Sequence, residues 1–291
     1  MKKDQIVISE DRGIISVSGP DAGDFLQNIL TNDVDKAVES NSIFSAIFTP
    51  QGKYLYEFFI IKSKDGYFLD CDNEFTEEII GYLSKYKLSS KIEIKNQSSL
   101  YVIGIISLEK FLEIQADEGK SAQTILYRES SVFIDPRVKE LGARILSSLE
   151  KLHLTIKKLN LKIVDDKEYL KKAYTCGVPI KGLKNLKDQL FGLEANFEKF
   201  KAIDFKKGCY IGQENTARMK LKNKLRRKLL PIKSESELKI GSDIMFNDIK
   251  IGKILINKPY PFALIKIFDP EISDFDNKEL SVDNKKVYIL K

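Results

Sequence analysis

The octapeptide Lys207-Gly208-Cys209-Tyr210-Ile211-Gly212-Gln213-Glu214 combines a thiol, two glycines, an amide and a carboxylate within eight residues of this 291-residue chain. The glycines on either side of Cys209 leave the backbone free to approach a ligand closely. Lys206 and Lys207 place positive charge beside the thiol, an environment that favours the reactive thiolate. Gln213 and Glu214 can together bind the polar edge of a heterocycle. The same residues also fit a buried cysteine in a turn, with the amide and carboxylate capping backbone groups, so the pattern alone leaves both interpretations open.

The composition around this motif is that of a globular protein, with 43% hydrophobic and 31% charged residues. Apolar runs such as Phe58-Phe59-Ile60-Ile61 are far shorter than the roughly 20 residues of a membrane-spanning helix. The three cysteines are widely spaced and His153 is the only histidine, which argues against a disulfide framework, a Cys/His zinc site or a histidine relay. The two lysines after Met1 are not followed by an apolar run, so we expect no secretory signal. We therefore expect a cytoplasmic protein with reduced thiols, no metal site and no membrane partner.

Positive charge is concentrated just after the octapeptide. Arg218 to Lys228 reads RMKLKNKLRRK, with seven basic residues and no acid, whereas the other 41 basic residues face 42 acidic ones. Basic and apolar residues alternate from Arg218 to Arg226, which predicts a strand with one basic face. Such a strand suits a lysine-guarded sheet edge, a wall for an anionic ligand or, less well, RNA contact, because interleaved aromatic residues are lacking.

The remaining sequence predicts mixed strands and helices. An opening hairpin is expected from 5–8 and 14–17, and helices are expected after Asp21, after Asn73 and over 108–115 and 165–174. Further strands are predicted over 42–49, 54–61, 66–70, 91–95, 100–106, 124–127 and 132–134. Short strand-like runs after residue 229 predict a small β-barrel. The fold class is therefore α+β, with a body over 1–228 and a barrel over 229–291. Neither a Rossmann motif nor a P-loop is present.

The octapeptide resembles the signature of the YgfZ family, folate-binding proteins related to the aminomethyltransferase, or T-protein, of the glycine cleavage system. The resemblance spans nearly the whole chain and is closest to the branch with the mitochondrial iron–sulfur assembly factor. Its further motifs are Gly19–Val34, Thr49–Lys53, Asp135-Pro136-Arg137 with Leu141–Arg144, Gly177-Val178-Pro179, Leu193–Phe197 and Arg226–Pro231.

This resemblance implies a T-protein-like folate-binding body of two intertwined lobes, followed by the barrel. It implies binding of tetrahydrofolate or another reduced, possibly polyglutamylated, folate, and support for assembling or repairing iron–sulfur clusters in client enzymes. Cys209 is expected to be the functional thiol. The expected folate-binding residues are Lys207, Gly208, Tyr210, Gly212, Gln213, Glu214, Arg218, Glu194, Asn32 and Asp33. The basic run would then hold a folate glutamate tail.

Three alternatives remain open at this stage. The chain could be a folate-dependent aminomethyltransferase, although Glu77 stands where the T-protein has its aspartate. It could be a factor related to tRNA modification, with no direct nucleic-acid contact expected. Glu194 could cap a helix rather than bind a pterin. Cys71 and Cys176 are expected to be small buried residues.

Overall fold

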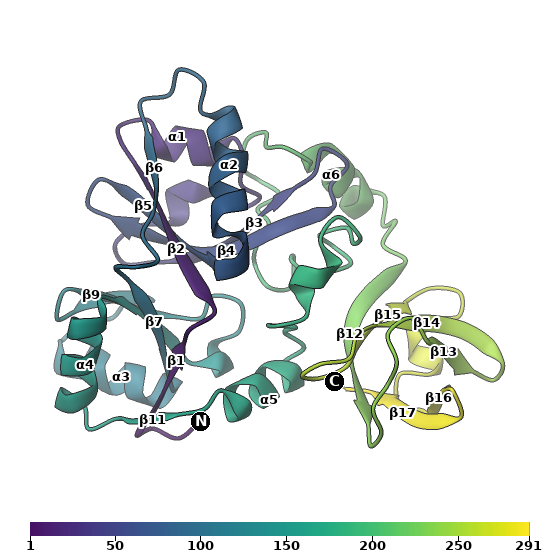
Figure 1. Ribbon diagram of the computed structural model, residues 1–291. Helices are drawn as coiled ribbons and strands as arrows, with labels where there is room; N and C mark the ends of the chain where they lie inside the picture. The colour runs from purple at the N-terminus through teal and green to yellow at the C-terminus, as the bar shows by residue number, and fades with distance from the viewer. Residues whose placement is uncertain (291) are drawn as a thin grey trace. The chain divides into compact units, whose positions relative to one another are not determined.

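The computed structural model describes residues 1–290, and its chain forms two compact units (Figure 1). The first unit consists of Met1–Phe48, Tyr56–Tyr169 and Lys199–Ile211. The second consists of Thr49–Leu55, Leu170–Glu198 and Gly212–Lys291. The boundary at residue 228 predicted from the sequence stays a prediction about domain organisation.

The first unit contains a six-stranded sheet in the order β11-β1-β7-β10-β9-β8. Its core is built from Ile6, Ile106, Ile145 and the side chains of two helices that pack against it. The strands are β1 (Gln5–Ser9), β7 (Val102–Ile106), β8 (Thr124–Tyr127), β9 (Ser130–Ile134), β10 (Ala143–Ser147) and β11 (Lys162–Val164), and the helices are α3 (Leu108–Asp117) and α4 (Leu149–Lys158). Ser107 and Ser148 begin these helices, because each side chain accepts a backbone N–H from the first turn.

A second sheet of the same unit has the order β3-β4-β5-β2-β6. Its strands are β2 (Arg12–Ser18), β3 (Ile43–Phe48), β4 (Tyr54–Ser63), β5 (Gly66–Asp72) and β6 (Glu93–Asn96), with helices α1 (Ala22–Gln27), α2 (Thr76–Tyr86) and α5 (Lys167–Thr175) elsewhere in the chain. In the antiparallel pairing of β2 and β5, Ile15 lies opposite Leu69. Every residue of β3 is buried, which explains why five of its six residues are apolar, Ser45 being the exception.

The second unit ends in a closed six-stranded antiparallel barrel, β12-β15-β14-β13-β16-β17. The strands are β12 (Arg227–Ser234), β13 (Asp243–Phe246), β14 (Ile249–Ile256), β15 (Phe262–Lys266), β16 (Leu280–Val282) and β17 (Lys285–Ile289). Ile232, Ile254, Phe275 and Val287 fill its interior. The predicted α+β class with a C-terminal barrel is confirmed.

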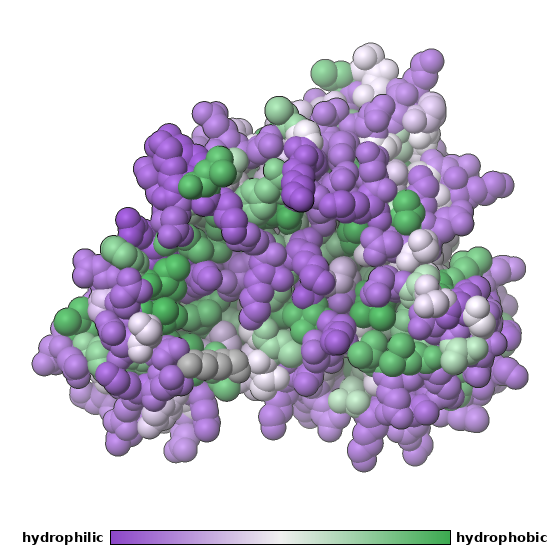
Figure 2. Space-filling model, turned by 180° about the vertical axis from the view of Figure 1, so that it is seen from behind, coloured by the Kyte–Doolittle hydropathy of each residue, from purple (hydrophilic) through white to green (hydrophobic). Residues whose placement is uncertain are grey.

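Hydrophilic residues cover most of the face of the molecule that Figure 2 shows. Short 3₁₀ turns complete the chain. The turns are η1 (Val34–Lys36), η2 (Asn73–Phe75), η3 (Lys139–Leu141), η4 (Leu183–Leu186) and η5 (Ile272–Asp274). Among residues 1–290, no helix has the length and apolar character needed to cross a membrane.

Two of the local predictions are wrong. The strands at 5–9 and 12–18 exist but lie in different sheets, since β1 pairs with β7 and β11 whereas β2 pairs with β5 and β6. The basic run begins as helix α6 (Gln213–Leu221), followed by a loop, and only Arg227 and Lys228, its last two residues, enter a strand. Ala, Arg, Met, Lys and Leu are all good helix formers, so the period-2 pattern of charge was a poor guide to this short segment.

Candidate functional site

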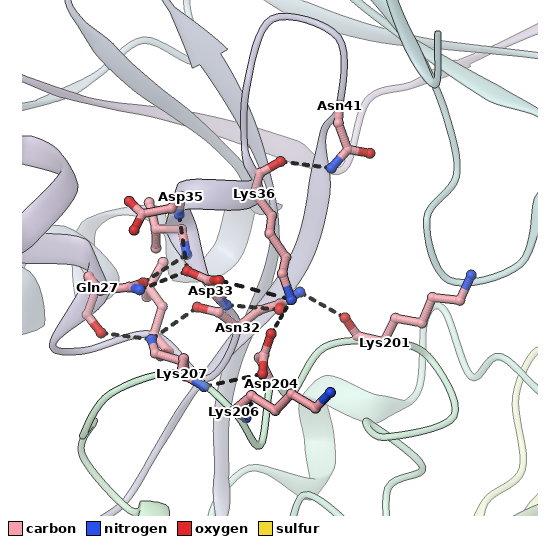
Figure 3. A network of polar contacts seen from close by, with 12 residues as sticks. Gln27, Asn32, Asp33, Asp35, Lys36, Asn41, Lys201, Asp204, Lys206 and Lys207 are labelled. Atoms are coloured by element: carbon pink, nitrogen blue, oxygen red, sulfur yellow. Dashed lines mark hydrogen bonds and ion pairs between the residues drawn. The ribbon is translucent and has the colours of Figure 1, made fainter.

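Lys207, the first residue of the octapeptide, is anchored by the backbone of the first unit (Figure 3). Its ammonium donates to three carbonyl oxygens, those of Gln27 at 2.7 Å, Leu30 at 2.6 Å and Asn32 at 3.0 Å. Burial lowers the pKa of Lys207 to about 8, against the opposing attraction of Asp33, Asp204 and Asp35. Lys207 therefore ties the octapeptide to the turn that follows α1. The ammonium that was expected to act on the neighbouring thiol is held by these carbonyl oxygens.

Asn32 and Asp33, both predicted site residues, lie in the same network. The Asn32 amide donates to the carbonyl oxygens of Phe44 and Lys201, each at 2.8 Å. Asp33 accepts a hydrogen bond from the Gln27 side chain at 2.7 Å and caps the turn η1. These two side chains shape the turn that receives Lys207, so the structure gives them a positioning role within the protein.

Asp204 connects Lys36 to the backbone of Lys206 and Lys207. One carboxylate oxygen accepts the backbone N–H groups of Lys206 at 2.6 Å and Lys207 at 3.2 Å, and the other pairs with the ammonium of Lys36. Although burial opposes it, these hydrogen bonds hold the pKa of Asp204 below its usual value. The loop network, defined as Asn32, Asp33, Lys36, Asp204 and Lys207, thus fixes residues 201–207 against residues 31–36.

Cys209 follows two residues after the anchor and is exposed, whereas Cys71 is buried and Cys176 is partly exposed. Burial raises the pKa of Cys71 to about 12, so that this thiol stays protonated at neutral pH. The interpretation of Cys209 as a buried, packed cysteine is wrong, and the expectation of burial holds for Cys71 only. A Cβ added at Gly208 would meet no atom within 4 Å, and the residue has no positive φ. This position therefore does not require glycine.

The second half of the octapeptide begins α6 in the second unit. Gly212 has a φ of 84°, the left-handed region that favours glycine, and the helix starts at the next residue. Asn215 donates to the carbonyl of Gln51 at 2.8 Å. A Cβ at Gly52 would lie 3.0 Å from the Thr216 hydroxyl, so glycine lets this loop approach the helix closely. The structure therefore brings Thr49–Lys53, a motif of the resemblance, against α6.

Glu194 is also in the second unit and is only 3% exposed. One oxygen accepts from the Arg227 guanidinium at 2.8 and 2.9 Å, and the other accepts the backbone N–H of Phe191 at 3.1 Å. Both oxygens are therefore engaged by protein groups, and because no helix begins at this point, the carboxylate caps a turn rather than the helix of the alternative. Glu214 and Arg218, in contrast, are exposed on α6.

The predicted site residues thus fall into two groups. Lys207, Asn32 and Asp33 meet in the loop network, with Gly208, Cys209 and Tyr210 directly following in the same unit. Glu194, Gly212, Gln213, Glu214 and Arg218 belong to the other unit. No local sequence pattern points to Gln27, Lys36 and Asp204, because their partners lie up to 180 residues away.

A second group of charges, buried in the first unit, was also missed. Asp70 accepts from Arg12 at 2.6 Å and from Arg144 at 2.7 Å, and Asp135 pairs with Arg137 at 2.7 Å. These five residues are the core network. A charge inside an apolar strand, as in Tyr67-Phe68-Leu69-Asp70-Cys71, is the signal that could have revealed it, because buried charges are rare unless they are paired.

Glu77, which the resemblance is expected to align with the T-protein aspartate, lies in the first turn of α2 and is exposed. It accepts a hydrogen bond from the Asn96 amide at 2.7 Å. No contact in the described part of the chain joins it to the loop network.

No family model matches this chain. Among solved structures, the glycine cleavage system aminomethyltransferase T from Bartonella henselae aligns with 99% of this chain and 85% of its own, with a TM-score of 0.77 and 13% sequence identity. A likeness at that identity defines the fold alone, and the fold is that of the T-protein.

Similarity in sequence to curated proteins is more specific than the likeness of fold. The chain is 31% identical over 237 residues to the mitochondrial iron–sulfur cluster assembly factor IBA57 homologue of Mycosarcoma maydis, and 26% identical over 246 residues to mouse IBA57. These alignments cover 76% and 79% of this chain, but 55% and 66% of the relatives. The chain is therefore similar to the IBA57 iron–sulfur cluster assembly factors, and its predicted resemblance to the YgfZ family is confirmed.

Proposed function

We propose that this protein binds a reduced folate and supports the assembly or repair of iron–sulfur clusters in client enzymes. Its relatives carry the name of iron–sulfur cluster assembly factors, which supports the second part. The chain spans little more than half the length of the first of them, so their role is part of the proposal rather than a property of this chain. The T-protein fold supports the folate part, because the resemblance implies that this fold binds folate.

One observation carries the proposal most directly, namely the exposed Cys209 beside an anchored backbone. The loop network fixes the residues before the thiol, so the chain presents it without having to order a flexible loop first. An exposed thiol can act in cluster chemistry, since Cys thiolates are the usual ligands of iron–sulfur clusters. Cys71 is buried and protonated and cannot play this part.

The residues on α6 suit a folate chemically. Glu214 offers an exposed carboxylate for the amino and ring N–H groups of a pterin, and Arg218 offers an exposed guanidinium for a glutamate carboxylate. Glu194, Asn32 and Asp33 already hold protein groups, so we assign their main contribution to positioning. Their direct contact with folate stays a prediction.

Titration of the purified protein with tetrahydrofolate tests the folate part. We expect saturable heat in calorimetry, and weaker binding when Arg218 is changed to Gln. Arg128→Gln is the control, because Arg128 is also exposed but lies in the turn between β8 and β9. No heat at millimolar tetrahydrofolate would exclude folate as the ligand while leaving the cluster role standing.

No contact in the described part of the chain favours an aminomethyltransferase or a tRNA-modification factor over the proposed function. Glu77 is held at the surface by Asn96, and the aminomethyltransferase likeness shows the fold alone. The cytoplasmic location predicted from the sequence stays a prediction, and the relatives compared here are named as mitochondrial proteins. Fractionation of cells that express the tagged protein would decide the location.

A further inference from the structure

Helix α6 and the loop after it form a surface segment of concentrated positive charge. Seven of the eleven residues from Arg218 to Lys228 are basic and none is acidic. Two of them have protein partners, because Lys220 pairs with Glu198 at 2.5 Å and Arg227 pairs with Glu194 at 2.8 Å. The charge of the segment far exceeds what these two carboxylates neutralise.

Four other cations of the segment are exposed and have no carboxylate within ion-pair distance among residues 1–290. They are Arg218, Lys222, Lys224 and Arg226. Exposed charges at this density repel one another, which disfavours the folded arrangement unless something outside the chain compensates it.

Stabilisation of the helix end does not account for four cations. The C-terminus of α6 is closed by its own backbone, since the N–H of Lys224 bonds to Met219 O at 2.9 Å and that of Asn223 to Lys220 O at 3.2 Å. Asn223, with a φ of 47°, supplies the left-handed residue of this motif. A helix macrodipole amounts to about half a charge at its end. One cation would suffice for it.

Two exposed apolar side chains accompany these cations, one within the segment and one in contact with Arg226. Leu221 is 85% exposed, and Phe268 is 50% exposed with the Arg226 guanidinium 4.3 Å from its ring centre. A folate glutamate tail or an RNA would use the cations but would gain nothing from Leu221. RNA would also use several aromatic side chains for stacking, and Arg226 already occupies one face of Phe268. Arginine and aromatic residues beside an exposed aliphatic anchor are typical of protein interfaces.

We propose that this basic surface, composed of Leu221, Lys222, Lys224, Arg226 and Phe268, docks an acidic face of a partner protein. Charge complementarity determines the partner's chemistry: a cluster of Asp and Glu around a small apolar patch that receives Leu221. The class of partner rests on the proposed function, which makes it an iron–sulfur client or assembly protein.

The test begins with a photo-crosslinking amino acid at Leu221 in the full chain, expressed in its own cell. The control carries it at Ile240, which is 54% exposed in the barrel-containing unit. The protein captured at 221 but not at 240 is identified and purified. Its binding is then measured for Lys222→Glu with Lys224→Glu, and for the matched control Lys239→Glu with Lys253→Glu, two exposed lysines outside the basic surface.

We expect the first double variant to bind roughly tenfold more weakly or worse, the control to bind like the wild type, and salt to weaken wild-type binding steeply. Acid-to-lysine changes on the partner should restore binding to the first double variant. Equal binding by both double variants, or no capture specific to 221, would overturn the docking surface. Protection of position 221 by tRNA or by penta-γ-glutamate, with no protein captured there, would assign the surface to those ligands instead.

These outcomes separate the docking surface from the proposed function. A captured partner that has no link to iron–sulfur clusters, but shows the expected charge dependence, would keep the surface and overturn the proposed role. Loss of charge dependence together with intact support of iron–sulfur enzymes would overturn the docking surface and keep the proposed function.

Discussion

The core network and the loop network use the same chemistry in the same unit but for different ends. In the core network, Asp70 and Asp135 pair with three guanidinium groups, and those of Arg144 and Arg137 lie 4.3 and 4.7 Å from the ring centre of Phe59. In the loop network, the partners of Lys207 are backbone carbonyl oxygens, and exposed residues follow immediately.

The difference shows that burial determines whether a group of charged residues stabilises the fold or positions a loop. The core network links strands β2, β5 and β10, so its charges hold the sheets of the unit in register. The loop network links a turn to a loop that carries Cys209, and its failure should disturb the loop before the fold. Four experiments test this contrast, in order of decreasing effect on stability.

Asp70→Asn should have the largest effect. It leaves Arg12 and Arg144 buried without their shared carboxylate, and breaking a buried pair in this way costs about 3–5 kcal/mol. Urea denaturation measures the loss. The control is Asp165→Asn, which removes an exposed pair with Lys167 and should cost less than about 1 kcal/mol. Similar losses in both variants would contradict the structural role of the core network.

Lys207→Met should be intermediate. Three carbonyl oxygens lose a donor, and leaving buried acceptors unpaired costs about 1–3 kcal/mol. Hydrogen exchange over residues 201–210 should rise more than elsewhere. Lys206→Met is the matched control, because Lys206 is exposed and its contact with Asp204 uses its backbone N–H, which the substitution keeps. Uniformly faster exchange across the first unit would mean that Lys207 supports the fold rather than the loop.

The pH dependence of stability should differ between the wild type and Lys207→Met. The pKa of Lys207 is about 8 in the native state and about 10.5 in the unfolded chain, because burial disfavours its charge. Between these values the unfolded chain binds more protons, so this group makes the wild type more stable as pH rises. The difference in unfolding free energy, wild type minus variant, should therefore increase from pH 8 to 10. A decrease would show that the carbonyl oxygens raise the pKa instead.

Cys209→Ser should have the smallest effect on stability. The side chain is exposed, so we expect a change within about 0.5 kcal/mol. The variant should nevertheless fail to restore the activity of iron–sulfur enzymes in cells that lack the native protein. In the wild type, iodoacetamide should modify Cys209 faster than Cys71, whose pKa of about 12 keeps it protonated. Full complementation together with slow alkylation would make the cysteine structural and leave Gln213 and Glu214 as the working part of the motif.

Local sequence patterns predicted the strands β3, β4 and β5 and most of the barrel, because alternating or continuous apolar residues report burial directly. They failed for the pairing of β1 and β2, where a plausible turn at 10–13 instead carries the chain from one sheet to another. They also failed for Arg218–Leu221, since nine residues of helix leave too short a pattern to separate a period of 2 from one of 3.6.

The sequence by itself determined the fold class, the barrel and the position of the octapeptide, because these depend on composition, local hydrophobic pattern and a motif contiguous in the chain. Only the tertiary structure decided what the octapeptide's residues do. Lys207 is an anchor rather than a neighbour of the thiol because its partners lie at Gln27, Leu30 and Asn32, some 175–180 residues away. Hydrogen bonds between such distant residues depend on chain packing, and no local pattern encodes them.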